Sequence, residues 1–120
     1  MKTSELTGQA LDWAVAMCEG IDHDTAAMNI MFGDDNGWFL AFSTDWAQGG
    51  PIIERERMDI ECWDFNSMPW KASMWWDDED SSGDIKMYGP TPLIAAMRCY
   101  VASKLGEEVD VPELLQGESK

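Results

Sequence analysis

The chain has 120 residues, of which 45% are hydrophobic, so it can form one globular domain over residues 1–120. It carries 23 acidic residues against eight basic ones, a formal charge of −15, and seven Trp. This charge repels phosphate backbones and anionic lipids, which argues against direct nucleic-acid binding and against membrane binding. It favours partners with basic surfaces.

The three Cys residues, Cys18, Cys62 and Cys99, are widely spaced and odd in number. This indicates reduced thiols in a cytosol rather than the disulfide framework of a secreted protein. No apolar run approaches the roughly 18–20 residues of a membrane span, and the first residues lack the pattern of a signal peptide. The sequence therefore predicts a soluble cytoplasmic protein.

The first predicted element is a helix between Thr7, a good N-cap residue, and Gly20, which suits a helix end. Apolar residues recur at helical spacing along this segment and include Trp13, which we expect in the core. Asp12 and Ala16 fall on the opposite side, which is expected to face solvent.

The middle of the chain is expected to form strands. Residues 28–32 ("MNIMF") and 38–42 ("WFLAF") read as two strands joined by a tight turn at Asn36-Gly37. Two further strands are expected at Met58–Trp63 and Trp70–Trp76. An acidic loop at about residues 77–84 is expected to follow them.

The clearest helix lies near the C-terminus, where Thr91 supplies an N-cap, Pro92 suits the first turn and Gly106 follows the last turn. Residues from about 107 to 120 are expected to form a polar tail. The residues of this tail that can fold back onto the domain are Val109, Val111 and Leu114. The order of elements predicts an α+β fold, a small antiparallel sheet with an N-terminal and a C-terminal helix packed on one face.

Residue types that support catalysis are sparse. His23 is the only histidine, no Cys-x-x-Cys pair is present, and Gly49-Gly50 lacks the sequence context of a phosphate-binding loop. A calcium-loop alignment of the acidic run places Gly89 where a bidentate Glu is required. The sequence therefore predicts no catalytic residues, no metal site, no cofactor and no enzymatic activity.

The stretch "STDWAQGGPIIERE" (Ser43–Glu56) combines hydrogen-bonding side chains, an indole that can stack on a flat ring, and two glycines that allow close backbone approach. These groups suit a ligand rich in amides or resembling a nucleotide. The candidate ligand-binding residues are Ser43, Thr44, Asp45, Trp46, Gln48, Gly49 and Gly50.

Four stretches resemble the NinX-type proteins of lambdoid phages and enterobacterial prophages: "SELTGQALDWAVA" (Ser4–Ala16), "STDWAQGGPIIERE", "WKA" (Trp70–Ala72) and "YGPTPLIAAMRCYVASKLG" (Tyr88–Gly106). They keep the same order and cover about half of the chain. The resemblance implies a phage accessory protein that acts in the cytoplasm of the bacterial host. It implies no particular mechanism.

Three interpretations remain open. In the first, the protein is not an enzyme and binds a small ligand or a host factor through Ser43–Glu56. By analogy with other phage accessory proteins, this binding serves to counter host defence. In the second, this stretch is only a rigid corner: Asp45 caps a turn, Trp46 fills the edge of the core, and a short helix starts at Gly49-Gly50-Pro51.

In the third interpretation the protein is an acidic decoy that mimics nucleic acid and blocks a basic host protein. Its partner surface is expected to centre on Asp77, Asp78, Glu79, Asp80 and Asp84. Exposed Trp residues and unpaired strand edges in a small sheet also favour a homodimer.

Overall fold

The computed structural model describes residues 1–33, 37–62, 69–77 and 82–115, and in these it has four α-helices and a three-stranded antiparallel sheet. The α+β class predicted from the sequence is therefore confirmed. The elements are η1 (Thr3–Glu5), α1 (Gly8–Cys18), α2 (His23–Phe32), α3 (Trp46–Glu56), β1 (Asp59–Cys62), β2 (Trp70–Asp77), β3 (Ser82–Gly89), α4 (Pro92–Leu105) and η2 (Glu113–Leu115).

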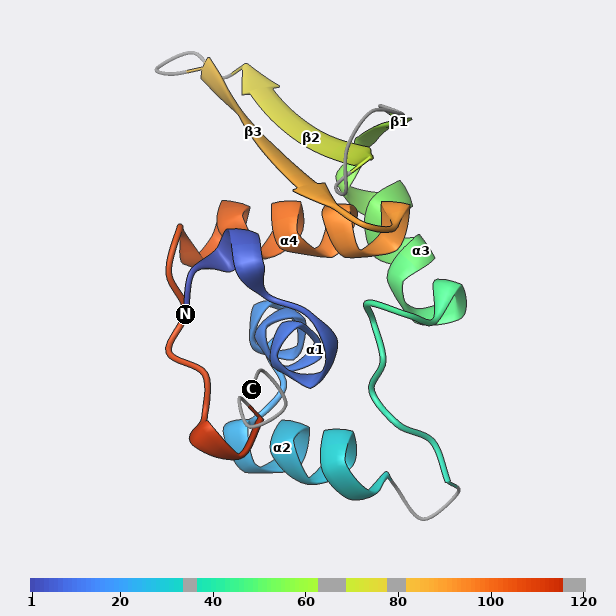
Figure 1. Ribbon diagram of the computed structural model, residues 1–120, viewed down its shortest axis with the longest axis vertical. Coiled ribbons are helices and arrows are strands. Elements are labelled where there is room, and N and C mark those ends of the chain that lie inside the picture. The colour runs from blue at the N-terminus through green and yellow to red at the C-terminus, as the bar shows by residue number, and fades with distance from the viewer. Residues whose placement is uncertain (34–36, 63–68, 78–81, 116–120) are drawn as a thin grey trace.

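The elements stack in layers, as Figure 1 shows: the sheet lies at one end, α4 crosses beneath it, α1 lies below α4, and α2 forms the far end. The C-terminal helix thus packs directly on the sheet, whereas the N-terminal helix packs on α4. The core runs between these layers, and α4 has the most buried residues of any helix described. None of the helices in the described ranges is long and apolar enough to cross a membrane.

Helix α4 begins and ends as its sequence predicts. The Thr91 hydroxyl accepts a hydrogen bond from the Ile94 backbone N–H at 3.1 Å, Pro92 is the first helical residue, and Gly106 is the C-cap. The preceding Gly89 lets β3 approach the helix, because a Cβ at this position would lie 2.8 Å from the Ala95 nitrogen.

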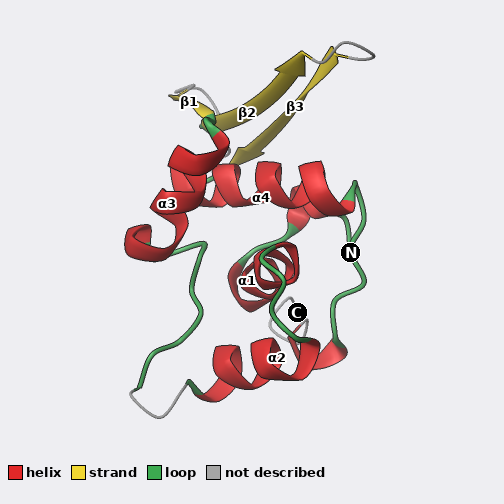
Figure 2. Ribbon diagram, turned by 180° about the vertical axis from the view of Figure 1, so that it is seen from behind, coloured by secondary structure: helices red, strands yellow, loops and turns green. Residues whose placement is uncertain are grey.

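The hairpin predicted at residues 28–42 is wrong. Residues 28–32 belong to α2, whose N-cap is Asp22 and which buries Ala26 and Ile30, four residues apart, on one face. Residues 38–42 form no strand and connect α2 to α3 along one edge of the molecule (Figure 2). Asn36 lies outside the described residues, and Gly37 adopts a positive φ of 83°.

The strands predicted at Met58–Trp63 and Trp70–Trp76 are confirmed as β1 and β2, with Trp63 outside the described residues. The acidic loop predicted at 77–84 is wrong at both ends, because Asp77 ends β2 and Ser82–Asp84 begin β3. Residues 78–81 lie outside the described ranges. β1 and β3 are the edges of the sheet, and the homodimer expected from such edges stays a prediction.

The segment after α4 packs back onto the domain, as predicted for its apolar residues. Val109 and Val111 are buried, and so is Leu115, which the sequence did not single out. The side chain of Leu114 lies outside the described residues. Asp12 and Ala16 are buried as well, so the prediction that they face solvent is wrong, whereas Trp13 lies in the core as expected.

Arg55 joins three helices at the surface. Its guanidinium lies 2.7 Å from the Glu19 carboxylate after α1 and donates to the Tyr100 hydroxyl of α4 at 2.9 Å. The Tyr100 hydroxyl also donates to Glu19, and the hydrogen bond from Arg55 is the largest cause that holds the pKa of Glu19 below its usual value.

Replacing Arg55 with Ala is expected to lower the free energy of unfolding by only about 1 kcal/mol, because Arg55 is half exposed and solvent screens its charge. Because the pKa of Glu19 is lower in the folded state, its ionised carboxylate stabilises the fold at pH values above the pKa of Glu19 in the unfolded chain. This stabilisation is lost as the pH falls through the folded-state pKa. Urea unfolding should therefore show a difference between Arg55→Ala and wild type near neutral pH that shrinks in acid. A difference that is unchanged in acid would contradict the role of Glu19.

Candidate functional site

The carboxylate of Asp45 caps helix α3. It accepts a hydrogen bond from the Ala47 backbone N–H at 3.0 Å, and the Asp45 carbonyl accepts from the backbone of Gln48 and Gly49, each at 2.9 Å. The expected capping role is therefore confirmed, but the helix begins at Trp46, three residues earlier than predicted. The carboxylate is already bound to the protein's own backbone and is less available to a ligand.

The Gln48 amide holds the connection between α2 and α3 against the start of α3. Its oxygen accepts from the Ala41 backbone N–H at 2.9 Å, and its nitrogen donates to the Phe39 carbonyl at 2.8 Å and to Asp45 at 3.2 Å. These bonds use both ends of the amide. Gln48 therefore shapes the backbone of residues 39–41 rather than offering hydrogen bonds to a ligand.

Ser43 is buried against α1. Its backbone N–H donates to the Asp12 carboxylate at 2.8 Å, and its hydroxyl is buried without a hydrogen-bond partner in the described structure. Burial raises the pKa of Asp12 to about 6, and the backbone N–H and the hydroxyl of Ser43 both oppose this rise. The hydroxyl lies near the carboxylate but does not meet the geometry of a hydrogen bond. Ser43 thus joins two parts of the core.

The two glycines of the stretch differ in their surroundings. A Cβ at Gly49 would lie 2.4 Å from the Phe42 carbonyl oxygen and 2.7 Å from Leu93 of α4, so only glycine fits there. At Gly50 the nearest atom would be in the Trp46 ring, at an ordinary 3.7 Å. The close approach at Gly49 serves packing of the protein onto itself.

Of the seven candidate residues, only Thr44 and Trp46 are exposed. The prediction in the corner interpretation that Trp46 fills the core edge is wrong, because 54% of Trp46 is exposed. It belongs to a group of large apolar residues that are between 46% and 66% exposed. We call this group the aromatic surface, and its members are Met28, Phe32, Trp38, Phe39 and Trp46.

The segment that carries Trp38 and Phe39 is held to α2 and to α3 by close contacts and hydrogen bonds. The ring of Phe39 lies close to Gly33, next to Phe32, with only 3.1 Å between the ring and a Cβ built at Gly33. Asn29 of α2 accepts the Leu40 backbone N–H at 2.8 Å, and Gln48 holds Phe39 and Ala41 against α3. The connection is thus fixed on both sides while its aromatic rings face outward.

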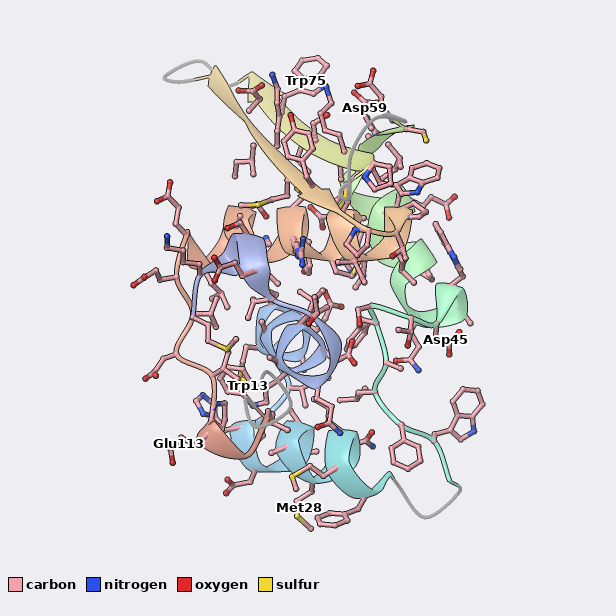
Figure 3. The ribbon with its side chains drawn as sticks, in the orientation of Figure 1. Trp13, Met28, Asp45, Asp59, Trp75 and Glu113 are labelled. Atoms are coloured by element: carbon pink, nitrogen blue, oxygen red, sulfur yellow. The ribbon has the colours of Figure 1, made fainter. Side chains whose placement is uncertain are left out.

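A shallow hollow of about 360 Å³ lies beside this surface on α2, and its walls include Asp24, Met28, Asn29 and Gly33. Asp22 and Asp24 are exposed at the start of the same helix. Figure 3 shows Met28 at one end of the molecule, with Trp75 at the opposite end. The hollow therefore places the apolar side chain of Met28 near the carboxylate of Asp24.

The sequence did not identify Phe32, Trp38 and Phe39 as surface residues, because residues 28–32 and 38–42 were interpreted as two strands with buried faces. The signal available in the sequence was the unusual number of Trp residues, too many for one small core.

The acidic decoy surface is only partly described. Asp78, Glu79 and Asp80 lie outside the described residues, as does the side chain of Asp77, whereas Asp84 lies on β3 opposite Trp75. On the sheet face away from α4, Lys71 lies 2.8 Å from Glu61 and Lys86 lies 3.6 Å from Asp84, and Asp59 adds a third carboxylate. This face is of mixed charge where it is described.

The thiols of Cys18 and Cys99 offer little reactivity, because burial raises their pKa values to about 12, whereas Cys62 is exposed at the end of β1. Within the described ranges, no three His, Cys, Asp or Glu residues gather as a metal ion would require.

A protein-family model described as Bacteriophage P22, NinX matches residues 2–104. The match includes the aromatic surface and the stretch 43–56, and it stops before the segment that follows α4. No curated protein matches the chain at a significant level.

Proposed function

Because this match spans most of its length, the chain belongs to the family of phage P22 NinX, and we propose that this phage accessory protein binds a host protein through the aromatic surface. The observation that carries the proposal is the exposure of five large apolar side chains on one fixed segment and its neighbours. Clusters of exposed apolar side chains mark interaction sites, and Trp is frequent among residues that dominate binding energy.

The partner that fits this surface is a host protein with a basic patch. Asp22 and Asp24 flank the surface on α2, and the chain as a whole carries −15. The hollow beside Met28 suits the stem of a lysine or arginine, with Asp24 at its wall to pair with the charged end. Steering by the overall charge would speed the encounter at low salt.

A small ligand at Ser43–Gly50 has weaker support, because Ser43, Asp45 and Gln48 already serve internal contacts. The decoy interpretation also has weaker support, since the described sheet face is mixed in charge. We therefore propose a binding protein without catalytic activity, acting in the host cytoplasm on a protein whose inhibition helps the phage, such as a defence factor.

The proposal predicts that a Trp38→Ala/Trp46→Ala variant keeps its fold but loses its host partner. Both residues are largely exposed, so stability should change little, whereas removing two interface Trp residues should weaken binding by at least about 100-fold. The measurement is affinity capture from host lysate at low and high salt, with proteins identified by mass spectrometry.

The matched control is Trp75→Ala, which removes a Trp of similar exposure on strand β2, at the end of the molecule opposite Met28. A basic host protein that wild type and Trp75→Ala retain, and that the double variant loses, is the expected result. Retention by all three proteins, or a partner without a basic surface, would count against the proposal.

A further inference from the structure

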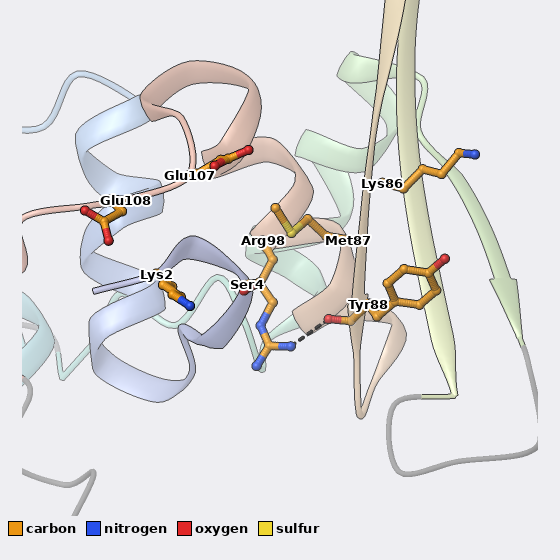
Figure 4. A pocket seen from close by; sticks show the side chains of 8 residues that line it. All are labelled: Lys2, Ser4, Lys86, Met87, Tyr88, Arg98, Glu107 and Glu108. Carbon is orange, nitrogen blue, oxygen red and sulfur yellow. Dashed lines mark hydrogen bonds between the residues drawn. The ribbon is translucent and has the colours of Figure 1, made fainter.

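A second concave region lies away from the aromatic surface, with a volume of about 550 Å³ (Figure 4). It is bounded by the start of the chain, by β3, by α4 and by the segment that follows α4. Its walls include Lys2, Ser4, Met87, Arg98, Glu107 and Glu108. Its size is in the range of cavities that bind small molecules.

Arg98 forms the floor of this cavity and is only 2% exposed. Its Nε donates to the Leu6 carbonyl at 2.8 Å, and its Nη1 donates to the Tyr88 carbonyl at 2.6 Å. These bonds tie the guanidinium to the residue that follows η1 on one side and to the edge strand β3 on the other. The positive charge is therefore held in a fixed position at the base of the cavity.

Lys2 brings a second positive charge to the same space. The backbone around it is fixed by pairing with the segment after α4, because the Thr3 N–H donates to the Glu107 carbonyl at 2.8 Å and the Thr3 hydroxyl donates to the Gly106 carbonyl. Figure 4 shows the Lys2 ammonium and the Arg98 guanidinium on the same side of β3, with the Lys86 ammonium on the other side. In the described structure no carboxylate lies within 4.0 Å of the Lys2 ammonium.

The charge balance here differs from that of the chain. Over the whole sequence acidic residues outnumber basic ones by 23 to eight, whereas Lys2 and Arg98 face Glu107 and Glu108 across the cavity in equal number. Lys86 does not count here, because its ammonium lies on the other side of β3 and beside Asp84. The charge of Glu5 also acts on Arg98. Two cations aimed at one space repel each other, and an anion between them relieves that repulsion. The carboxylates of Glu107 and Glu108, on the wall after α4, can accept hydrogen bonds from a donor.

We propose that this cavity binds a small organic anion whose phosphate or carboxylate group lies between Lys2 and Arg98. Hydrogen-bond donors elsewhere on the ligand face Glu107 and Glu108, and Ser4 supplies a neutral hydroxyl. The volume suits a ligand of about the size of a nucleoside monophosphate. This site is separate from the surface proposed for the host protein, and it does not depend on that proposal.

The test is an NMR titration of the whole chain with uridine monophosphate, inorganic phosphate, acetate and uridine. It is performed at about 0.15 M salt, so that the net negative charge is screened beyond about 8 Å. Millimolar uridine monophosphate should shift the backbone amides of Ser4, Met87 and Arg98. Lys2→Gln should weaken this binding by about fivefold or more, whereas Lys104→Gln, which removes an exposed lysine outside the cavity, should change it by less than about twofold.

Phosphate or acetate should shift the same amides more weakly, and their relative effects identify which anionic group the site prefers. The absence of localised shifts with every anion would overturn the proposal. Equal weakening by Lys2→Gln and Lys104→Gln would also overturn it, because it would indicate attraction to net charge alone. Equal binding of uridine and its monophosphate would overturn the assignment of an anion.

Discussion

Replacing Gly49 with Ala is expected to destabilise the protein by more than about 2 kcal/mol and to lower its Tm by roughly 10 °C. The added methyl group would lie 2.4 Å from the Phe42 carbonyl oxygen, which requires movement of the backbone, and 2.7 Å from the end of the Leu93 side chain, which would also have to move. Helix α3 would have to shift away from α4, and the connection that carries Phe39 would shift with it. Thermal unfolding followed by circular dichroism measures the effect.

The matched control for this change is Gly50→Ala, one residue further along the same helix. Apart from its neighbours in the chain, the nearest atom to a Cβ at Gly50 would lie at 3.7 Å, and Ala is preferred to Gly inside a helix by about 1 kcal/mol. The ring of Pro51 crowds a Cβ on the preceding helical residue, which offsets this preference. Gly50→Ala should therefore change the stability by less than about 1 kcal/mol. Equal stability of the Gly49→Ala and Gly50→Ala variants would contradict a packing role for Gly49.

Replacing Asp12 with Asn is expected to stabilise the protein at about pH 7 and to remove part of its pH dependence. The folded-state pKa of Asp12 is raised to about 6 from an ordinary value of 3.8, chiefly by burial. Between these values the folded state binds more protons than the unfolded state, so stability falls as the pH rises. Above pH 6 the ionised group costs up to about 3 kcal/mol.

An Asn at this position is neutral, and its oxygen can still accept the Ser43 backbone N–H. The difference in unfolding free energy between Asp12→Asn and wild type should be about 1–2 kcal/mol near pH 7 and should vanish near pH 4. Comparing the two proteins at each pH cancels the titration of all other groups. Urea unfolding that gives the same difference at both pH values would contradict a buried, ionised Asp12.

The elements whose ends are set by local chemistry were predictable from the sequence. Thr91, Pro92 and Gly106 define α4 through capping and through backbone conformations that belong to those residue types. The capping role of Asp45 was predictable for the same reason.

Long-range contacts decided the features that were not predictable. The run "MNIMF" suits a buried helix or a buried strand, and the Asp22 cap together with burial against α1 selects the helix. The buried position of Asp12 could not be predicted, because its carboxylate bonds the Ser43 N–H, which is 2.8 Å away in space but 31 residues away in sequence. Strand β3 was missed although Ile85 and Met87 alternate with Asp84 and Lys86, which is the period of a half-buried strand.

The candidate site was predictable only in outline. The sequence marked Ser43–Glu56 as a shaped segment whose Trp could either stack on a ligand or fill the core edge, and Trp46 is exposed. Whether Gln48 and Ser43 face a ligand or the protein itself depends on the position of Phe39 and of α1, which one sequence does not specify. The aromatic surface depends in the same way on how residues 38–42 are held between α2 and α3.

The measurement that tests the host-protein proposal most directly is the affinity of the captured partner, purified, for three forms of the protein by isothermal titration calorimetry. We predict that Trp75→Ala binds as wild type does, that Trp38→Ala/Trp46→Ala binds at least about 100-fold more weakly, and that wild-type affinity falls as salt rises. Equal affinity of the double variant and Trp75→Ala, with both folded, would contradict the assignment of the aromatic surface as the binding site.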